Sequence, residues 1–381
     1  MESQDQSMSA DEIALYDRQI RLWGLKAQEK LRSANILLIT FKALANEVAK
    51  NLVLAGVGTL TIVDDATVRE EDLGAQFFLT DDCIGQNRAQ AAAPAVRSMN
   101  PRVQVFADTS NIATKTPEFF SQFDVTIATE LDISMYNTIN AACRISGRSF
   151  YAAGLHGFYG FVFSDLIQHD FVIERSKSNV PSPTQETPTR RILNITTKRE
   201  GDKIIEMVTK REVYTPLILA NTSPLPAEFT RLPRRRKQVT PLLSCLRALW
   251  EFQKIQGAFP SFSHHDLELF TKLARDAHQE LQLDISKLDS TFLRTFLQNI
   301  GSELSPVAAF LGGSLAQDVI NVLSAREQPL QNLLLFDGES SNAPMYPLHP
   351  IFDDVLGNSM PAVAPVANPI TINGKPGLGP A

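Results

Sequence analysis

The stretch that decides the fold reads Asn35-Ile36-Leu37-Leu38-Ile39-Thr40 and, after a helical pattern, Thr59-Leu60-Thr61-Ile62-Val63-Asp64. Both apolar runs have the length of a buried strand, and Leu44, Val48 and Leu52 recur between them at helical spacing. A strand, a helix and a second strand within about thirty residues form a βαβ unit, whose right-handed crossover makes the strands parallel. The stretch therefore predicts the start of a parallel sheet.

The alternation of strands and helices continues on both sides of this unit. Downstream, the pattern predicts a helix at 86–99, strands at 103–107 and 125–129, a helix at 136–146 and a strand at 149–153. Upstream, Ser9 and Glu12 have the spacing of a capping box, which predicts a helix that ends at Gly24. The pattern as a whole predicts an α/β fold, a doubly wound, Rossmann-like and mostly parallel sheet.

The second half of the chain interrupts this alternation with a loop, a hairpin and a helical insert. We expect the first part of the α/β domain at 1–175, a mobile loop at 176–189, a hairpin and linker at 190–239, a helical insert at 240–300, a return to the α/β domain at 301–352 and a disordered tail at 353–381. A helix at 305–323 is rich in small residues, which predicts close packing against this chain's own sheet or within a dimer seam.

Composition narrows the class of protein. Lys and Arg number 36 against 42 Asp and Glu, and this net charge of −6 argues against a protein that coats nucleic acid. No apolar run is long enough to predict a membrane span or a leader peptide. Cys83, Cys143 and Cys245 lie far apart, which indicates no disulfide framework and no zinc site, and His264-His265 predicts a helix start rather than a metal site. We therefore expect a protein of a reducing compartment without a bound metal.

The turn after the first strand carries no glycine. A nucleotide-binding βαβ unit places glycines there, so that backbone N–H groups can approach phosphate. Here Thr40, Ala43 and Ala45 replace the glycines, and Phe41 lies within the tight turn. The side chains at these positions predict that neither NAD nor ATP binds at this turn.

Several motifs of the sequence resemble a known family. YDRQIRLWG at 16–24, NLVLAGVG at 51–58 and TIVD at 61–64 are similar to the opening of the activating enzymes for ubiquitin-like proteins, which are related to the bacterial molybdopterin and thiamine sulfur-carrier adenylating enzymes. Within that superfamily, LGAQF at 73–77, GQNRA at 85–89 and SPVAAFLGG at 305–313 resemble the smaller subunits of SUMO-activating enzymes. The likeness covers about residues 12–170 and 300–348.

The resemblance implies a pair of adenylation-type halves, in which the larger subunit binds ATP and magnesium and carries the catalytic cysteine. This chain has Ala75 and Arg88 where the active halves have an arginine and a lysine, and Glu130 is its nearest match to a magnesium-binding aspartate. Asp64 keeps the position that binds ribose in active halves, but without the glycines we expect it to brace the sheet edge. The chain alone is therefore expected to bind no cofactor.

The resemblance also assigns a role to Arg18. In the family, the arginine of this motif reaches across the dimer into the partner's ATP site, where its planar cation suits phosphate. Arg21, three residues on, lies on the same face of the helix and is a candidate to assist. The alternative is a surface arginine paired with Asp17 or Glu12.

The remaining candidates are the cysteines and one basic cluster. Cys143 and Cys245 lie in helical apolar patterns that predict core positions, and Cys83 follows two aspartates, so none of the three suits a thioester nucleophile. Arg234, Arg235, Arg236 and Lys237 form a nuclear import signal or a solvated loop. The resemblance favours import, and we expect a location in the nucleus, with the cytoplasm also allowed.

These observations favour the regulatory, non-catalytic subunit of a heterodimeric SUMO-activating enzyme. Such a subunit is part of an ATP-dependent enzyme but is inactive alone; its partners are the larger catalytic-cysteine subunit and SUMO, with no nucleic acid and no membrane. The alternatives are the equivalent subunit for a Rub/Nedd-type modifier, a free-standing adenylating enzyme or NAD-dependent dehydrogenase, and a scaffold without an active-site residue. Gly74-Ala75-Gln76-Phe77 and the modest insert favour the SUMO type.

Overall fold

The computed structural model describes residues 8–177, 183–201 and 203–350, which lie in the compact unit that ends at Pro350. The predicted disordered tail at 353–381 lies outside the described residues, as do residues 178–182 of the predicted mobile loop.

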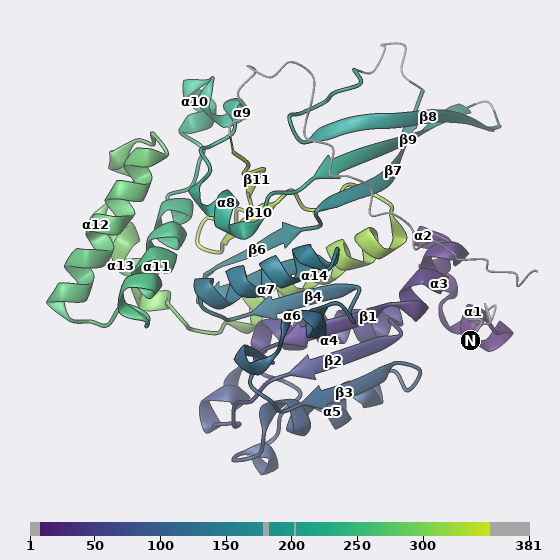
Figure 1. Ribbon diagram of the computed structural model, residues 1–381, viewed down its shortest axis with the longest axis horizontal. Coiled ribbons are helices and arrows are strands. Elements are labelled where there is room, and N and C mark those ends of the chain that lie inside the picture. Colours follow the sequence, from purple (N-terminus) through teal and green to yellow (C-terminus); the bar gives the residue numbers. More distant parts are fainter. Residues whose placement is uncertain (1–7, 178–182, 202, 351–381) are drawn as a thin grey trace, which may run out of the picture. The chain divides into compact units, whose positions relative to one another are not determined.

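An eight-stranded mixed sheet forms the centre of the described unit (Figure 1). Its order is β11 (Met345–Tyr346), β10 (Leu333–Asp337), β6 (Tyr159–Asp165), β5 (Ser149–His156), β4 (Val125–Thr129), β1 (Asn35–Ile39), β2 (Thr59–Val63) and β3 (Gln104–Asp108). The five strands from β5 to β3 pair in parallel, whereas the pairs β5–β6, β6–β10 and β10–β11 are antiparallel. The predicted doubly wound, mostly parallel α/β fold is confirmed.

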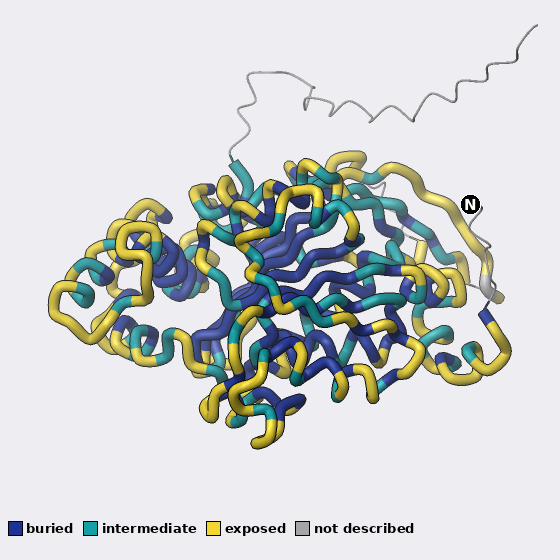
Figure 2. The backbone as a smooth tube through the Cα atoms, turned by 60° about the horizontal axis from the view of Figure 1, so that its bottom comes forward, coloured by how far each residue is buried: buried dark blue, intermediate teal, exposed yellow. Residues whose placement is uncertain are grey.

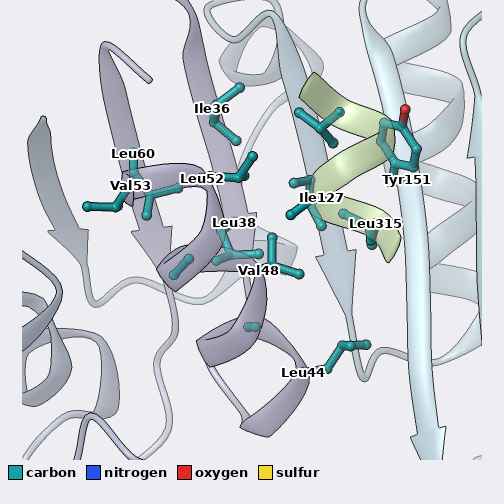
Figure 3. Close-up of a cluster of buried hydrophobic side chains, with 14 of the residues drawn as sticks. Ile36, Leu38, Leu44, Val48, Leu52, Val53, Leu60, Ile127, Tyr151 and Leu315 are labelled. Atoms are coloured by element: carbon teal, nitrogen blue, oxygen red, sulfur yellow. The ribbon is translucent and has the colours of Figure 1, made fainter. Parts of the chain in front are cut away.

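Alternating residues of β1 feed two apolar cores, one on each face of the sheet. Ile36 and Leu38 pack with α4 (Ala43–Ala55), whereas Leu37 and Ile39 pack on the opposite face. Figure 3 shows the first core, where Val48 and Leu52 of α4 lie among Ile36, Leu38 and Leu60. In Figure 2 the strands form a block of buried backbone beneath more exposed helices and loops. The other helices that share these cores include α3 (Leu25–Ser33), α5 (Arg88–Met99), α6 (Pro117–Phe120), α7 (Ile133–Ile145), α11 (Leu242–Gln256) and α14 (Ser305–Ser324).

The N-terminal region folds into short helices rather than one long helix. The capping box is present, because Ser9 Oγ accepts the Glu12 N–H at 3.2 Å and the Glu12 carboxylate accepts the Ser9 N–H at 2.9 Å. The prediction of one helix to Gly24 is wrong, since α1 (Ala10–Leu15) ends at Tyr16 and α2 (Asp17–Trp23) follows. Tyr16 is buried, and its hydroxyl accepts a hydrogen bond from Asn100 Nδ2 at 2.9 Å, which fixes the break.

The predicted hairpin is present and belongs to a second, three-stranded antiparallel sheet. Its order is β7 (Gln168–Ser176), β9 (Lys203–Val213) and β8 (Arg190–Glu200). β7 lies almost entirely within the range 1–175 expected for the α/β domain, and the sequence pattern predicted neither β7 nor β6 as a strand. Residues 183–189 fold back on the hairpin, where the Ile192 N–H donates to Thr184 O at 2.8 Å and Lys210 pairs with Glu186 at 2.6 Å. This described part of the predicted mobile loop is therefore bonded to the hairpin.

The region between the hairpin and α14 is helical. Its helices are α8 (Leu217–Thr222), α9 (Ala227–Thr230), α10 (Pro233–Arg236), α11, α12 (His264–Glu280) and α13 (Ser290–Asn299), with a 3-10 turn η4 (Ile285–Lys287) between the last two. The basic cluster thus lies on a short helix, α10, and not in a solvated loop. Trp250 of α11 packs edge-on against Phe161 of the central sheet, with 5.2 Å between ring centroids, so the insert shares the core of the α/β domain.

The small-residue helix α14 packs against α4 of the same chain. A Cβ at Gly312 would lie 2.5 Å from Glu47 Cβ, so only glycine permits this approach, whereas Gly313 faces open space. By length and composition α14 could span a membrane, but 61% of that stretch is buried inside the described unit. The predicted packing against the chain's own fold is therefore observed for one face of the helix.

Candidate functional site

The turn between β1 and α4 is closed by its own side chains. Thr40 adopts a left-handed backbone with φ of 64°, and Phe41 turns inward, fully buried and stacked on Phe78. Ala43 and Ala45 are also buried, at no more than 1% exposed. Side chains thus fill the space that glycines leave open in a phosphate-binding turn.

The carboxylate of Asp64, which directly follows β2, accepts a backbone hydrogen bond from this turn. The carboxylate accepts the Phe41 N–H at 2.7 Å, the Ala66 N–H at 2.9 Å and Arg88 Nη1 at 3.1 Å. Arg88 also contacts Asp72 at 3.4 Å, and the three charged side chains are almost completely buried. Asp64 therefore braces the sheet edge through a buried ion-pair network, and its carboxylate is fully engaged.

The N-terminus of α4 is capped by a carboxylate from a distant part of the chain. Glu303 Oε1 accepts the Ala43 N–H at 3.2 Å, and its other oxygen accepts from Gln76 Nε2 at 3.2 Å. A helix N-terminus carries partial positive charge and attracts anions, which in nucleotide-binding relatives of the fold are phosphates. Because Glu303 takes that position here, the residues of the turn do not fit ATP.

Glu130, the nearest match to a magnesium ligand, is also held internally. Its Oε1 accepts the Leu155 N–H at 2.7 Å. Burial and then the neighbouring charge of Glu303 raise the pKa of Glu130 to about 8, against a smaller opposing effect of Lys42. Within the described ranges no group of three or more His, Cys, Asp or Glu side chains is arranged to hold a metal ion. Glu130 is therefore a partly buried acid whose pKa lies well above its ordinary value.

Arg18 lies on the exposed face of α2. Both carboxylates that could have paired with it bind other cations: Asp17 pairs with Arg21 at 3.0 Å, and Glu12 pairs with Arg32 at 3.0 Å and with Arg102 at 3.5 Å. Arg18 makes no ion pair or hydrogen bond within the described part of the chain. The alternative of a surface pair with Asp17 or Glu12 is therefore wrong, whereas Arg21 does form such a pair.

Arg18 lies far from the turn of its own chain. Gln19 Nε2 donates to Leu54 O at 3.2 Å, which places α2 beside the last turn of α4, while the β1–α4 turn precedes its first residue. A helix of 13 residues is about 20 Å long at 1.5 Å per residue. Figure 1 shows the same separation, with α2 beside the beginning of β1. Arg18 is therefore an exposed residue on a helix that packs beside the opposite end of α4 from the turn.

The cysteines do not form a nucleophilic site. Cys143 and Cys245 are fully buried, and burial raises the pKa of the Cys143 thiol to about 12 and that of Cys245 still further. Cys83 is partly exposed and contacts Thr80 Oγ1 at 3.5 Å. The predicted core positions of Cys143 and Cys245 are confirmed, and neither thiol has the lowered pKa that thioester chemistry needs.

One participant in this region was missed from the sequence. Glu303 lies 260 residues after Ala43, and it precedes α14 in a stretch without a recognisable motif. No local pattern connects it to the turn. The contacts of Asp64, in contrast, could be anticipated from its position at the end of the second strand.

The fold and the turn together define a class: an adenylation-type α/β protein that lacks the nucleotide-binding turn of its class. The model of the ThiF family matches residues 16–352, and the chain belongs to this family. It is 36% identical over 357 residues to the DNA damage tolerance protein RHC31 of Saccharomyces cerevisiae, covering 91% of this chain and 99% of that protein. It is 35% identical over 346 residues to SUMO-activating enzyme subunit 1 of Xenopus laevis, covering 90% and 97% of the two chains. The human SUMO-activating enzyme subunit 1 is 34% identical over 338 residues, covering 88% and 94%.

Proposed function

We propose that this chain is the smaller, regulatory subunit of a heterodimeric SUMO-activating enzyme, and that Arg18 acts in trans at the ATP site of the larger subunit. The similarity to relatives named SUMO-activating enzyme subunit 1 covers almost the whole of both chains, which supports this assignment. The single observation that carries the role of Arg18 is its exposed, unpaired position about 20 Å from a turn that is closed to nucleotide.

The part that Arg18 plays in this proposal is electrostatic. The larger subunit would bind ATP and magnesium, and the C-terminal carboxylate of SUMO would attack the α-phosphate as pyrophosphate departs. A guanidinium is planar and permanently charged, so Arg18 would stabilise the negative charge on the phosphates during this transfer. Arg21 would assist less, because its side chain is already paired with Asp17. Cys143 and Cys245 are buried, which is consistent with thioester formation on the larger subunit.

The proposal is tested by reconstitution from separately purified chains. We expect this chain to co-purify in equal amounts with a larger, cysteine-bearing adenylating subunit, and we expect a SUMO thioester on that subunit only when both chains and ATP are present. A Rub/Nedd-type modifier in place of SUMO is the matched control. A thioester formed on this chain alone would favour the alternative of a free-standing enzyme. Activation of the Rub/Nedd-type modifier and not of SUMO would favour the equivalent subunit for that modifier.

Nuclear import remains a proposal for the basic cluster. Arg234 and Arg235 are exposed on α10, and Arg235 Nη1 contacts Glu228 O at 3.5 Å. We expect replacement of Arg234–Lys237 by glutamine to shift a fluorescent fusion of the chain to the cytoplasm in cells that lack the larger subunit. A replaced protein that stays nuclear in those cells would refute the import role.

A further inference from the structure

A cavity of about 270 Å³ lies between the basic helix α10 and the turn that follows α12, outside the region of Arg18 and Asp64. In Figure 1, α10 lies beside one end of α12. The cavity is lined by Pro233, Arg236, Lys237, Val239, His278, Gln282, Leu283, Asp284 and Lys287. It is smaller than the cavities of about 300–1,000 Å³ that hold drug-sized ligands, so it suits one small chemical group.

The charged groups of the cavity are unbalanced. Arg236, Lys237 and Lys287 contribute three cations, against the single carboxylate of Asp284. Neither lysine forms an ion pair within 4 Å among the residues that the structure describes. The hydrogen bonds from Ser286 lower the pKa of Asp284, and the two lysines contribute further, so this carboxylate is ionised. An excess of two positive charges remains.

The other titratable group of the cavity is neutral. Burial lowers the pKa of His278, whose ring nitrogens contact Ser244 Oγ at 2.8 Å and Asp284 O at 3.0 Å. The carbonyl groups at the end of α12 are also occupied: those of Ala277, His278 and Gln279 accept N–H groups of residues 281–283. These carbonyl groups are therefore satisfied within the chain.

Arg236 is the third cation of the cavity lining. Its Nη2 donates to Thr230 O at 2.8 Å, which holds the guanidinium in place. A guanidinium is permanently charged, so Arg236 contributes a fixed positive charge beside the two lysines.

We propose that this cavity binds a phosphate dianion, either the phosphate of a phosphoserine or phosphothreonine side chain or free inorganic phosphate. The charge of a phosphate at neutral pH, between about −1.5 and −2, matches the excess charge of the cavity. Its oxygens can accept from both lysines, which are exposed at the rim, and the fixed charge of Arg236 adds to the attraction. The inference rests on α10 and α12 alone and is independent of the proposed SUMO function.

The test is a titration of the full chain with inorganic phosphate, with a phosphoserine peptide and with the same peptide unphosphorylated, followed by calorimetry. Lys237→Gln with Lys287→Gln removes two cavity cations, and Arg234→Gln with Arg235→Gln makes the same charge change at residues that do not line the cavity. All four side chains are exposed, so both double variants are expected to fold, which thermal unfolding verifies.

We expect the cavity variant to bind phosphate at least about tenfold more weakly, since each lost charge-assisted hydrogen bond is worth roughly a factor of ten. The control variant should bind within about twofold of the original chain. If the phosphopeptide and inorganic phosphate each bind, the ligand is a phosphorylated side chain. If inorganic phosphate binds and the phosphopeptide does not, the ligand is the free ion. Absence of phosphate binding, equal loss in both variants, or equal binding of the unphosphorylated peptide would overturn the proposal.

Discussion

The polar groups at the two ends of α4 differ in whether they are paired within the chain. At its N-terminus, the N–H groups that could meet a nucleotide are taken by Asp64 and Glu303, and Arg88 neutralises Asp64 within the core. Beside its C-terminus, α2 exposes Arg18, a permanent cation without a partner in the described chain. The two ends of α4 therefore differ in what they leave open: the N–H groups of the turn are satisfied within the chain, whereas Arg18 is exposed and unpaired among the described residues.

The largest effect is expected from substitution of Arg18, which lies beside the C-terminus of α4. In the assembled heterodimer, Arg18→Ala should slow ATP–pyrophosphate exchange with SUMO by about 10²–10³-fold, as for the loss of one preorganised group that stabilises transition-state charge. Arg21→Ala is the matched control, and it should cost much less because Arg21 is paired with Asp17. Both variants should assemble normally on gel filtration. If the rate of ATP–pyrophosphate exchange is unchanged in Arg18→Ala, the chain would act only as a scaffold for the larger subunit.

Removal of Asp64 from the turn before α4 is expected to destabilise the chain. Asp64→Ala leaves Asp72 as the one remaining ion-pair partner of the buried Arg88 guanidinium, and it leaves the Phe41 N–H without its acceptor. The substitution should therefore lower the free energy of unfolding by about 3 kcal/mol. Asp65→Ala at the next position removes an exposed contact to Asn111 and should cost less than about 1 kcal/mol. Urea unfolding of both variants measures the difference. Equal losses would mean that the ion-pair network does not hold the turn closed.

Glu130 near the closed turn predicts a pH dependence. Its folded pKa of about 8 lies above the ordinary value of 4.5, so the folded state keeps a proton that the unfolded state releases. Stability should therefore fall as pH rises from about 5 to about 8.5, and Glu130→Gln should remove this part of the pH dependence. Urea unfolding across this range measures it, with Glu70→Gln at an exposed position as the control. Parallel curves for Glu130→Gln and the original chain would contradict the assigned pKa.

The smallest effects concern the helix that packs on α4. Gly312→Ala places a Cβ 2.5 Å from Glu47 Cβ and should destabilise the chain by about 1–2 kcal/mol. Gly313→Ala meets no atom within 4 Å and should stabilise it by up to about 1 kcal/mol through helix propensity. Thermal unfolding of this neighbouring pair compares the two faces of α14. The same sign for both substitutions would show that α14 does not approach α4 as described.

Local patterns account for what could be predicted from the sequence. The apolar run of β1, the capping box at Ser9 and the absence of glycine after Thr40 are each contained in a few consecutive residues, and the structure agrees with them. The break at Tyr16 was missed because its cause is a contact with Asn100, 84 residues away. The Glu303 cap was missed for the same reason, since its partner Ala43 is 260 residues away.

One of the strands that were missed, β7, lacks the expected apolar pattern. β7 carries His169, Asp170 and Glu174 among its apolar residues and is only partly buried, so it has no run of core residues. The position of Arg18 relative to its own turn depends on how α2 packs against α4, which no periodicity specifies. Its role could be anticipated only through the resemblance of the motif at 16–24.

Nucleotide stoichiometry tests the central claim most directly. Calorimetry with Mg-ATP should give no binding to the isolated chain and one ATP for each heterodimer with the larger subunit. Saturable binding of ATP to the isolated chain, or two ATP molecules for each heterodimer, would contradict the conclusion that Asp64 and Glu303 have closed this turn.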